Sequence, residues 1–325
     1  MKILLVTNMF PSENRPDYGV FVKEQMDAVS RRFPEVDYEL YYIDNTNGNK
    51  AYLRSVIDIN RKISGGRYDL VHIHYGLSGL FLLWPFRRWK VPVVVTLHGG
   101  DIQPEQGKTV QVALTNRILR HADAAISLND RMTALAGRRC SNVAKIACSV
   151  DTEIFAPSES RRHSAADGTV RLLFPSNPAR KVKNYPLFEA VVAKLEHKYG
   201  LKADTVCVMN MTRSEVAQAM RDSDLMLMTS ISEGSPQAVK EAMACNLPVV
   251  STKVGDVDML LDGVGRCVCS ASDDPEALAD HVFAALGDES CTGMTGREKI
   301  FALGLDHDSV AARIFDIYLS LINRP

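Results

Sequence analysis

The sequence lacks several features that mark other classes of protein. No apolar run is long enough to span a membrane, and the first one, Ile3–Val6, is too short for the hydrophobic region of a signal peptide. The formal net charge is only −1, so there is no bulk attraction to nucleic acid. No Gly-x-Gly-x-x-Gly follows the first expected strand, which argues against a dinucleotide oxidoreductase. We therefore expect a cytoplasmic protein without a nucleic-acid partner.

Cysteine is present but does not form a disulfide pattern. The chain has seven Cys in 325 residues, an odd number in a chain that is long enough to bury its own cores. Cys267 and Cys269 form Cys-x-Cys, but no second Cys or His pair lies at zinc spacing. These residues are typical of small apolar fillers in a reducing compartment. We expect no metal and no cofactor.

Short apolar runs alternate with helical patterns along the whole chain. Ile3–Thr7 has the continuous apolar character of a strand buried on both faces, and Val20–Arg32 has helical periodicity. The polar segment Ser158–Gly168 interrupts this alternation and is typical of a linker. Further strands are expected at Tyr38–Ile43, Leu70–Tyr75, Val91–Leu97, Ala124–Leu128, Val143–Ala147, Val170–Phe174, Thr205–Met209, Leu225–Thr229, Pro248–Ser251 and Arg266–Val268.

This alternation predicts an α/β protein with two doubly wound parallel sheets. We expect an N-terminal domain over residues 1–160, a second domain over 161–307, and a C-terminal helix over 308–325 that packs back on the first domain. Open α/β sheets bind ligands at the carboxyl ends of their strands. The chemistry should therefore lie in loops that follow strands, facing a cleft between the domains.

The most informative segment is Leu225–Val254. A buried strand is followed by a loop that carries Glu233 and Gly234, and then by a helix expected over Ser235–Cys245. Ser235 suits the N-cap of that helix, and the proline after it suits the first helical position. The free N–H groups of a helix start favour a pyrophosphate.

Two carboxylates flank this helix start. Glu241, on the helix, could accept the hydroxyls of a ribose, and Glu233 could hold sugar hydroxyls. Gly234 lets the backbone come close to a ligand. A lone pair of glutamates is more often a solvated helix residue and a capping acid. The ordered series of strand, loop, glycine, proline and helix favours the ligand site.

The segment resembles glycosyltransferase family 4, the retaining group 1 enzymes with the GT-B fold. The resemblance lies in the Glu-x7-Glu pattern from Glu233 to Glu241 and in the strand Leu247–Thr252 after it. It implies that Glu241 binds the donor ribose and that Glu233 binds the transferred sugar. The backbone around Gly234, Ser235, Gln237 and Ala238 would hold the distal phosphate.

A basic turn, Phe174–Asn184, follows the first strand of the second domain. Fixed cations stabilise the charge that develops on a departing diphosphate, and family members carry an Arg and a Lys here. Lys183 matches the Lys. Arg180 is our choice for the Arg; Lys181 is a rival, and Asn177 occupies the usual Arg position. A solvated basic turn is the alternative.

Two loops of the first domain resemble the family. Thr96–Asp101 implies that His98 lies near the anomeric carbon, although a lone His is more often a core residue. Asp101 could instead cap the next helix. Gly19, in Tyr18-Gly19-Val20, resembles the glycine that approaches the donor phosphate, with an ordinary turn as the alternative.

Two details depart from the family or mimic another one. Cys148–Asp151 replaces a common Asn-Gly-Val-Asp, which suggests a changed turn between the domains. Asp222-Ser223-Asp224 resembles the metal-binding Asp-x-Asp of the other major glycosyltransferase fold. We interpret it as structural, because it ends a helix and opens a strand.

The resemblance implies a metal-independent, retaining hexosyltransferase. It would use a UDP- or GDP-sugar and a saccharide or lipid-linked acceptor in surface polysaccharide or glycolipid synthesis. Another GT-B enzyme, such as a sugar-nucleotide epimerase or hydrolase, and a non-catalytic sugar-binding protein are the alternatives. Aromatic and basic residues interleave over Trp84–Lys90, which is typical either of a peripheral contact with the inner face of a membrane or of a solvated basic turn.

Overall fold

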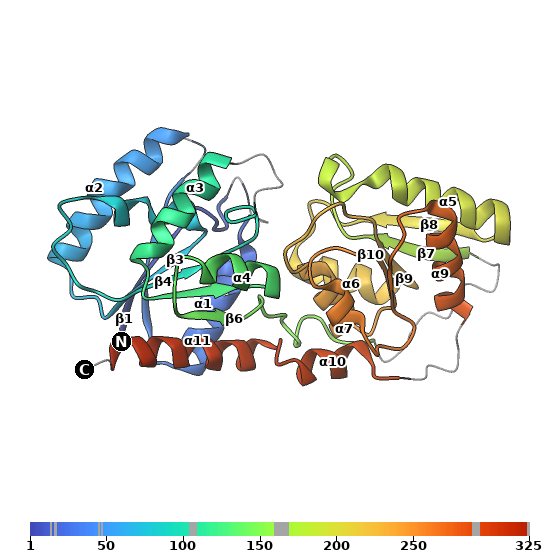
Figure 1. The fold of residues 1–325 in the computed structure, drawn as a ribbon. Helices are drawn as coiled ribbons and strands as arrows, with labels where there is room; N and C mark the ends of the chain where they lie inside the picture. The colour runs from blue at the N-terminus through green and yellow to red at the C-terminus, as the bar shows by residue number, and fades with distance from the viewer. Residues whose placement is uncertain are drawn as a thin grey trace. The chain divides into compact units, whose positions relative to one another are not determined.

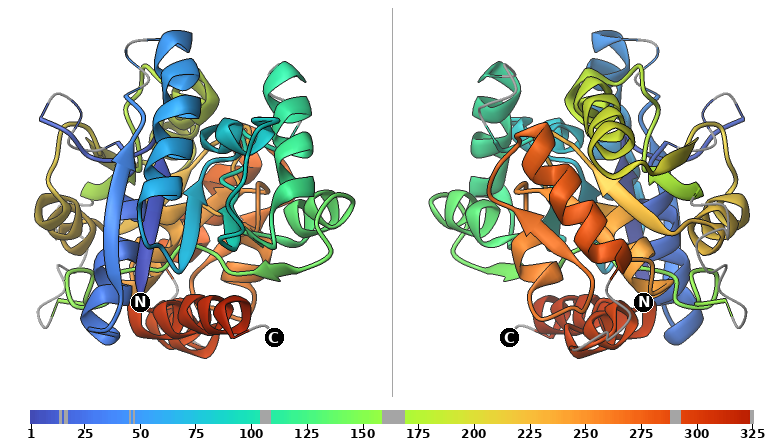
Figure 2. Two further views of the ribbon diagram at one scale, coloured as in Figure 1. Left: turned by 90° about the vertical axis from the view of Figure 1, so that its left-hand side faces the viewer. Right: turned by 90° about the vertical axis from the view of Figure 1, so that its right-hand side faces the viewer.

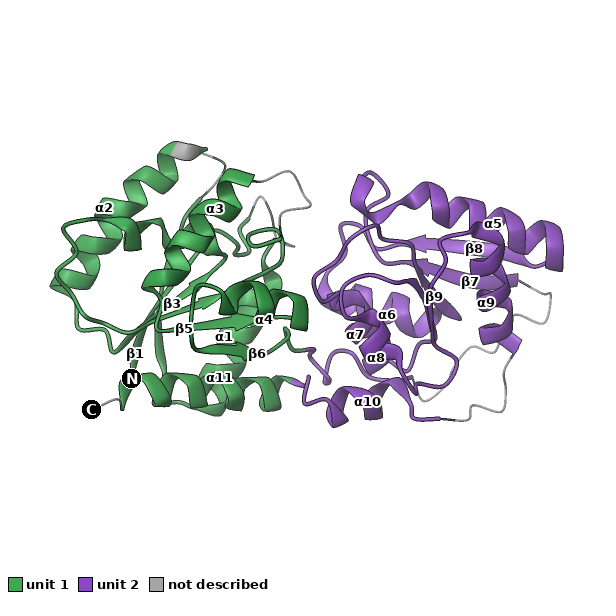
Figure 3. Cartoon of the chain, viewed as in Figure 1, with its two compact units in different colours: residues 1–149, 307–325 green, residues 150–306 purple. Residues whose placement is uncertain are grey.

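The computed structural model describes residues 1–13, 15, 18–44, 46, 48–103, 109–158, 169–287 and 293–323. The chain folds into two compact units (Figures 1 and 3). Unit 1 contains Met1–Ser149 and His307–Pro325, and unit 2 contains Val150–Asp306. The expected linker after Ser158, and the expected domain boundary at 160/161, lie outside the described residues.

The described part of unit 1 contains one six-stranded sheet in which every strand pair is parallel. The strand order is β2-β1-β3-β4-β5-β6. The strands are β1 (Lys2–Thr7), β2 (Asp37–Tyr42), β3 (Leu70–His74), β4 (Val93–Thr96), β5 (Ala124–Ser127) and β6 (Val143–Lys145). The central strands are buried along almost their whole length because helices cover both faces of the sheet.

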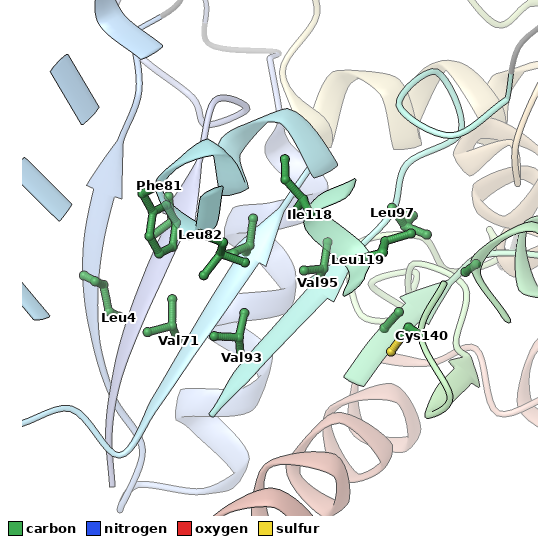
Figure 4. Packing of buried hydrophobic residues seen from close by; sticks show 14 of the residues in the cluster. Leu4, Val71, Phe81, Leu82, Val93, Val95, Leu97, Ile118, Leu119 and Cys140 are labelled. Atoms are coloured by element: carbon green, nitrogen blue, oxygen red, sulfur yellow. The ribbon is translucent and has the colours of Figure 1, made fainter. Parts of the chain in front are cut away.

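Each face of this sheet is buried by its own set of helices. The helices of unit 1 are α1 (Val20–Arg32), α2 (Asn49–Gly65), η2 (Gly76–Leu83), α3 (Thr109–Ile118), η4 (Leu119–His121), α4 (Asp130–Gly137) and α11 (His307–Ile322). On one face, Val71 and Val93 pack with Phe81 of η2 (Figure 4). On the other, Ile314 of α11 joins the cluster around Ile3 and Leu70. Burying each such side chain contributes roughly 1.5–3 kcal/mol.

The C-terminal helix α11 therefore belongs to unit 1 although the chain enters it from unit 2. It packs beside α1 (Figures 1 and 2), where the Phe33 and Phe315 rings stack with centroids 3.9 Å apart. The Tyr318 hydroxyl lies 2.8 Å from the Tyr38 hydroxyl of β2. These contacts join the two ends of the chain in one core.

Unit 2 contains a five-stranded parallel sheet among its described residues, in the order β11-β10-β9-β7-β8. Its strands are β7 (Thr169–Phe174), β8 (Lys202–Cys207), β9 (Leu225–Met228), β10 (Val249–Thr252) and β11 (Val268–Ser270). Its helices are η5 (Lys181–Lys183), α5 (Tyr185–Tyr199), α6 (Arg213–Asp222), α7 (Gln237–Ala244), α8 (Val257–Leu261), α9 (Pro275–Gly287) and α10 (Gly296–Ala302).

The last strand was expected at Arg266–Val268, and this was wrong. β11 begins at Val268 because Arg266 has a φ of 62° and so cannot continue an extended strand. No helix among the described residues combines the length and the apolar character needed to cross a lipid bilayer.

The two sheets share a topological feature that locates their ligand-binding edges. In unit 1 the first strand, β1, lies between β2 and β3; in unit 2 the first strand, β7, lies between β8 and β9. At such a topological switch point the chain connections leave in opposite directions, and the loops at the carboxyl ends of the strands open a crevice. The loops after β1 and β3, and those after β7 and β9, are therefore the expected places for ligands.

Candidate functional site

In unit 2, the loops after β7 and β9 bring a lysine and a glutamate together. The Lys183 Nζ lies 2.5 Å from the Glu233 Oε1, and the two side chains are only 14% and 16% exposed. Backbone contacts join the same loops, because Ile231 N–H donates to the Val182 carbonyl over 2.9 Å. The Thr229 hydroxyl also donates to the carbonyl of Lys183 over 3.1 Å. The ion pair is thus held at the switch point of the sheet.

The helix after Glu233 begins later than the sequence suggested. The N-cap of α7 is Pro236, not Ser235, and no side chain caps the helix. Pro236 has an extended ψ of 117°, which keeps it out of the first turn. Gln237 and Ala238 provide the first backbone N–H groups of α7, which point out of the helix at its start. They carry the partial positive charge expected of a helix start.

Gly234 is packed closely by the loop after β10. Gly255 has a φ of 59°, and a Cβ placed on it would lie 2.6 Å from the Gly234 carbonyl oxygen. Only glycine at position 255 allows this approach in a left-handed conformation. The loop after β10 therefore limits the path of the backbone at Glu233 and Gly234.

Glu241 is buried on α7 and forms an ion pair that the sequence did not suggest. An Nη of Arg213 lies 2.8 Å from the Glu241 Oε1, with side-chain exposures of 28% and 5%. Arg213 begins α6, and its guanidinium lies 4.6 Å from the centroid of the buried Phe155 ring. The only signal in the sequence for Arg213 is its position in the segment that follows strand β8.

The other basic residues of the turn after β7 are more exposed than Lys183. Arg180 and Lys181 are exposed and form no ion pair within the described part of the chain. Asn177 shapes the turn, since its Oδ1 accepts from Ala179 N–H over 2.9 Å and its carbonyl accepts from Arg180 N–H over 3.1 Å. Lys183 is thus the basic residue of the turn that contacts Glu233.

The Asp222-Ser223-Asp224 segment lies at the amino end of β9, opposite the Lys183–Glu233 pair along the strands. The Asp224 carboxylate accepts from Arg171 N–H over 2.7 Å, and the Asp222 carboxylate accepts from Gln218 over 2.8 Å. Both acids are engaged in connecting neighbouring segments, which supports the structural interpretation.

In unit 1, His98 follows β4 and is anchored by Asp101. The fully buried Asp101 carboxylate accepts from His98 N–H over 3.0 Å and from Gly76 N–H over 2.8 Å. Burial raises the pKa of Asp101, and these backbone donors oppose the shift. The suggestion that Asp101 caps the next helix stays a prediction, because α3 is described only from Thr109 onward.

The partly exposed His98 ring contacts a chain of buried polar side chains. The His74 Nδ1, at the end of β3, lies 3.2 Å from the His98 Nε2, and the two rings stack. The amide of Gln25 on α1 reaches the His74 Nε2 at 3.5 Å. Burial lowers the pKa of His98 to about 3 and that of His74 well below its usual value. Both imidazoles are therefore neutral at pH 7.

Gly19 is the N-cap of α1 and has a φ of 73°. A Cβ on it would lie 2.3 Å from the Met9 carbonyl carbon, so the backbone of the loop after β1 excludes any side chain there. This contact by itself requires glycine at position 19, whether or not a phosphate approaches it.

Comparisons with known proteins agree with this architecture. Residues 15–148 match the glycosyl transferase 4-like domain, and residues 178–288 match glycosyl transferases group 1. D-inositol 3-phosphate glycosyltransferase of Thermobifida fusca is 26% identical over 75% of this chain. The match spans 66% of that protein, and 83% of the Arthrobacter protein of the same name, which is 25% identical over 97% of this chain.

Solved structures share the fold over the whole chain. Sucrose-phosphate synthase from Thermosynechococcus elongatus has a TM-score of 0.78 at 17% identity and covers 98% of both chains. Anabaena HepE in complex with UDP-glucose has a TM-score of 0.71 at 16% identity and covers 99% of this chain and 100% of its own. Two Rossmann-like parallel sheets and two consecutive family matches lead to one assignment. The chain belongs to the group 1 glycosyltransferases of family 4, with the GT-B fold.

Proposed function

We propose that the protein is a retaining, metal-independent hexosyltransferase. It would move a sugar from a UDP- or GDP-sugar to a saccharide or lipid-linked acceptor in surface polysaccharide or glycolipid synthesis. The observation that carries the proposal is the Lys183–Glu233 pair, 2.5 Å apart, at the switch point of unit 2 and just before the start of α7. A cation, a carboxylate and the backbone N–H groups of a helix start together suit a sugar diphosphate.

Each of these groups has a separate task in the proposed reaction. Lys183 and the first N–H groups of α7 stabilise the charge that develops on the diphosphate as it departs. Glu233 accepts hydrogen bonds from sugar hydroxyls, and Glu241 accepts them from the ribose. These groups position the substrate and stabilise charge, and none of them acts as a covalent nucleophile in the proposed reaction.

The proposed transfer occurs on one face of the sugar. The bond from the anomeric carbon to the phosphate oxygen breaks, and its electrons remain on the phosphate. The acceptor oxygen bonds to the same face of the anomeric carbon, and its proton passes to the departing phosphate. The sugar becomes oxocarbenium-like in between, and the neutral His98 imidazole can orient its hydroxyls without adding positive charge beside it.

The relatives guide the choice of substrates for testing. The curated relatives are named for D-inositol 3-phosphate, and Anabaena HepE was solved with UDP-glucose. The decisive experiment screens UDP- and GDP-sugars by thermal shift. It then incubates the stabilising donor with saccharide, lipid-linked and D-inositol 3-phosphate acceptors. A glycoside with retained configuration supports the proposal. An epimer or free sugar without an acceptor, or no binding of any donor, contradicts it.

We also propose that Trp84–Lys90 contacts anionic lipid. Phe86 is 73% exposed and Trp84 is 37% exposed, while the Arg87 guanidinium lies 4.9 Å from the Trp89 ring. Exposed aromatic rings beside basic side chains suit a membrane interface. The protein should co-sediment with anionic vesicles but not with neutral ones, and Phe86→Ser should weaken this binding. Failure of the wild-type protein to bind anionic vesicles would refute the idea.

A further inference from the structure

We propose that Arg213 is a positioning residue for the nucleotide, acting by holding the Glu241 carboxylate toward the donor ribose. This inference rests on the proposed function, in which Glu241 accepts the ribose hydroxyls. It adds a residue on a different helix that has no part in the Glu-x7-Glu pattern. Arg213 lies on α6, after the edge strand β8, whereas Glu241 lies on α7, after β9.

The burial of Glu241 explains why a fixed partner is needed. Its side chain is only 5% exposed, and burying a carboxylate is costly unless charged or N–H groups contact it. Arg213 supplies an ion-pair contact of 2.8 Å to Oε1, although this oxygen accepts no hydrogen bond of regular geometry. This contact fixes the direction of the carboxylate before any nucleotide arrives. A preorganised acceptor loses less entropy when the hydroxyls bind.

The orientation of Arg213 is itself fixed on two sides. Arg213 is the first residue of α6, and a capping box fixes its backbone. In this box the Thr212 hydroxyl accepts from Glu215 N–H, and the Glu215 carboxylate accepts from Thr212 N–H. Its planar guanidinium lies over the buried Phe155 ring at 4.6 Å. A lysine would offer neither the planar stacking nor a fork of donors.

The alternative is that Arg213 only compensates a buried charge. The two roles differ in their dependence on the ligand. A positioning role through Glu241 requires ribose hydroxyls, whereas a role in folding, or a direct contact with the diphosphate, does not. A nucleotide that lacks those hydroxyls separates these possibilities.

The experiment measures binding of UDP and of 2′,3′-dideoxy-UDP to the full chain by calorimetry, with the matching GDP pair if the protein prefers guanine. Arg213→Met should weaken UDP binding about tenfold or more, with Arg213→Lys in between. Binding of the dideoxy nucleotide should be equal for wild type and Arg213→Met. Arg213→Met should add nothing in a Glu241→Gln background, where the double variant also removes the unpaired buried charge and so protects the fold.

Arg221→Met is the matched control. Arg221 lies on the same helix and donates to the Ile154 carbonyl over 3.2 Å, next to Phe155, so its loss tests the packing of this region alone. It should leave UDP binding unchanged. Equal weakening of UDP and dideoxy-UDP by Arg213→Met, or full UDP affinity in that variant, would overturn this inference but not the proposed function. Absence of any UDP or GDP binding by the wild-type protein would overturn both.

Discussion

The two switch points have the same topology, but one carries neutral side chains and the other carries charged ones. In unit 1 the polar side chains at the ends of β3 and β4 are neutral imidazoles, His74 and His98, held by one another and by backbone contacts. In unit 2 the corresponding edge carries full charges in compensated pairs, such as Lys183 with Glu233. Strand order therefore decides where a ligand binds, while the residues at the strand ends decide which part of it is recognised. A neutral edge suits a sugar, and a charged edge suits a diphosphate.

The largest expected effect comes from removing the acid of the charged edge. Glu233→Gln should lower the rate of transfer about 100- to 1000-fold, the usual loss for a group that acts on the transition state. Binding of UDP should not weaken, because the variant releases Lys183 from its ion pair. Steady-state kinetics and calorimetry separate the two quantities. Glu276→Gln, an exposed acid paired with Lys194 and Lys198, is the control and should change neither. Normal turnover by Glu233→Gln would remove this site assignment.

The next effect concerns the cation of the same pair. Lys183→Met should weaken UDP binding about tenfold to a hundredfold, since a charge-assisted contact contributes roughly 1.5–3 kcal/mol. Lys181→Met and Arg180→Met, in the same turn but exposed, should each have a much smaller effect. If one of these two variants weakens UDP binding more than Lys183→Met does, the phosphate cation has been assigned to the wrong residue. The measurement is again the dissociation constant for UDP.

The buried neutral histidines of unit 1 should make the free energy of unfolding depend on pH. Burial lowers the pKa of His72 and His98 to about 3, whereas an unfolded histidine titrates near 6.5. Below about pH 6.5 these histidines bind protons in the unfolded chain but not in the native chain. The free energy of unfolding must therefore fall as the pH falls toward 3. Each histidine can contribute up to about 1.4 kcal/mol per pH unit.

Tryptophan fluorescence can assign this loss to unit 1, because the two Trp of the chain, Trp84 and Trp89, both lie there. Denaturant titrations followed by fluorescence should show the loss between about pH 7 and about pH 5. His98→Asn should reduce the slope, while the exposed His197→Gln should leave it unchanged. A flat profile in the wild-type protein would mean that these imidazoles are not buried as described.

The sequence predicted best what depends on local pattern. Helix α1 has the expected bounds, because a glycine precedes it and it buries one apolar face. The edge strand β8 begins at Lys202, three residues before the expected Thr205. It escaped detection there because an edge strand exposes polar side chains such as Asp204 and so lacks the continuous apolar run of a central strand.

Contacts between distant segments could not be predicted in this way. Lys183 and Glu233 were each noticed from their own loop, but the 2.5 Å contact between them depends on the order β9-β7 in the sheet. Arg213 was missed, and Asp101 was considered only as a helix cap, because their partners Glu241 and Gly76 lie on other loops and helices. Nothing in the residues before Arg213 indicates that it will turn toward a buried carboxylate.

The smallest effect tests whether the neutral edge is preorganised by its second histidine. His74→Phe preserves ring volume but leaves the His98 Nε2 without the partner that lies 3.2 Å away. A lost neutral hydrogen bond costs about 0.5–1.5 kcal/mol, so kcat/KM for the donor sugar should fall roughly threefold to tenfold. Binding of UDP should stay unchanged, because UDP carries no sugar for His98 to orient.

Combining His74→Phe with Glu233→Gln tests whether the two edges act on the sugar independently. If a histidine pair in unit 1 and an acid in unit 2 contact the sugar independently, their effects on kcat/KM should multiply. Restoration of activity by His74→Gln, whose amide can again reach the His98 ring, would support hydrogen bonding over packing. Loss of UDP affinity in His74→Phe would instead mean that the histidine edge takes part in nucleotide binding, and the division between a neutral and a charged edge would fail.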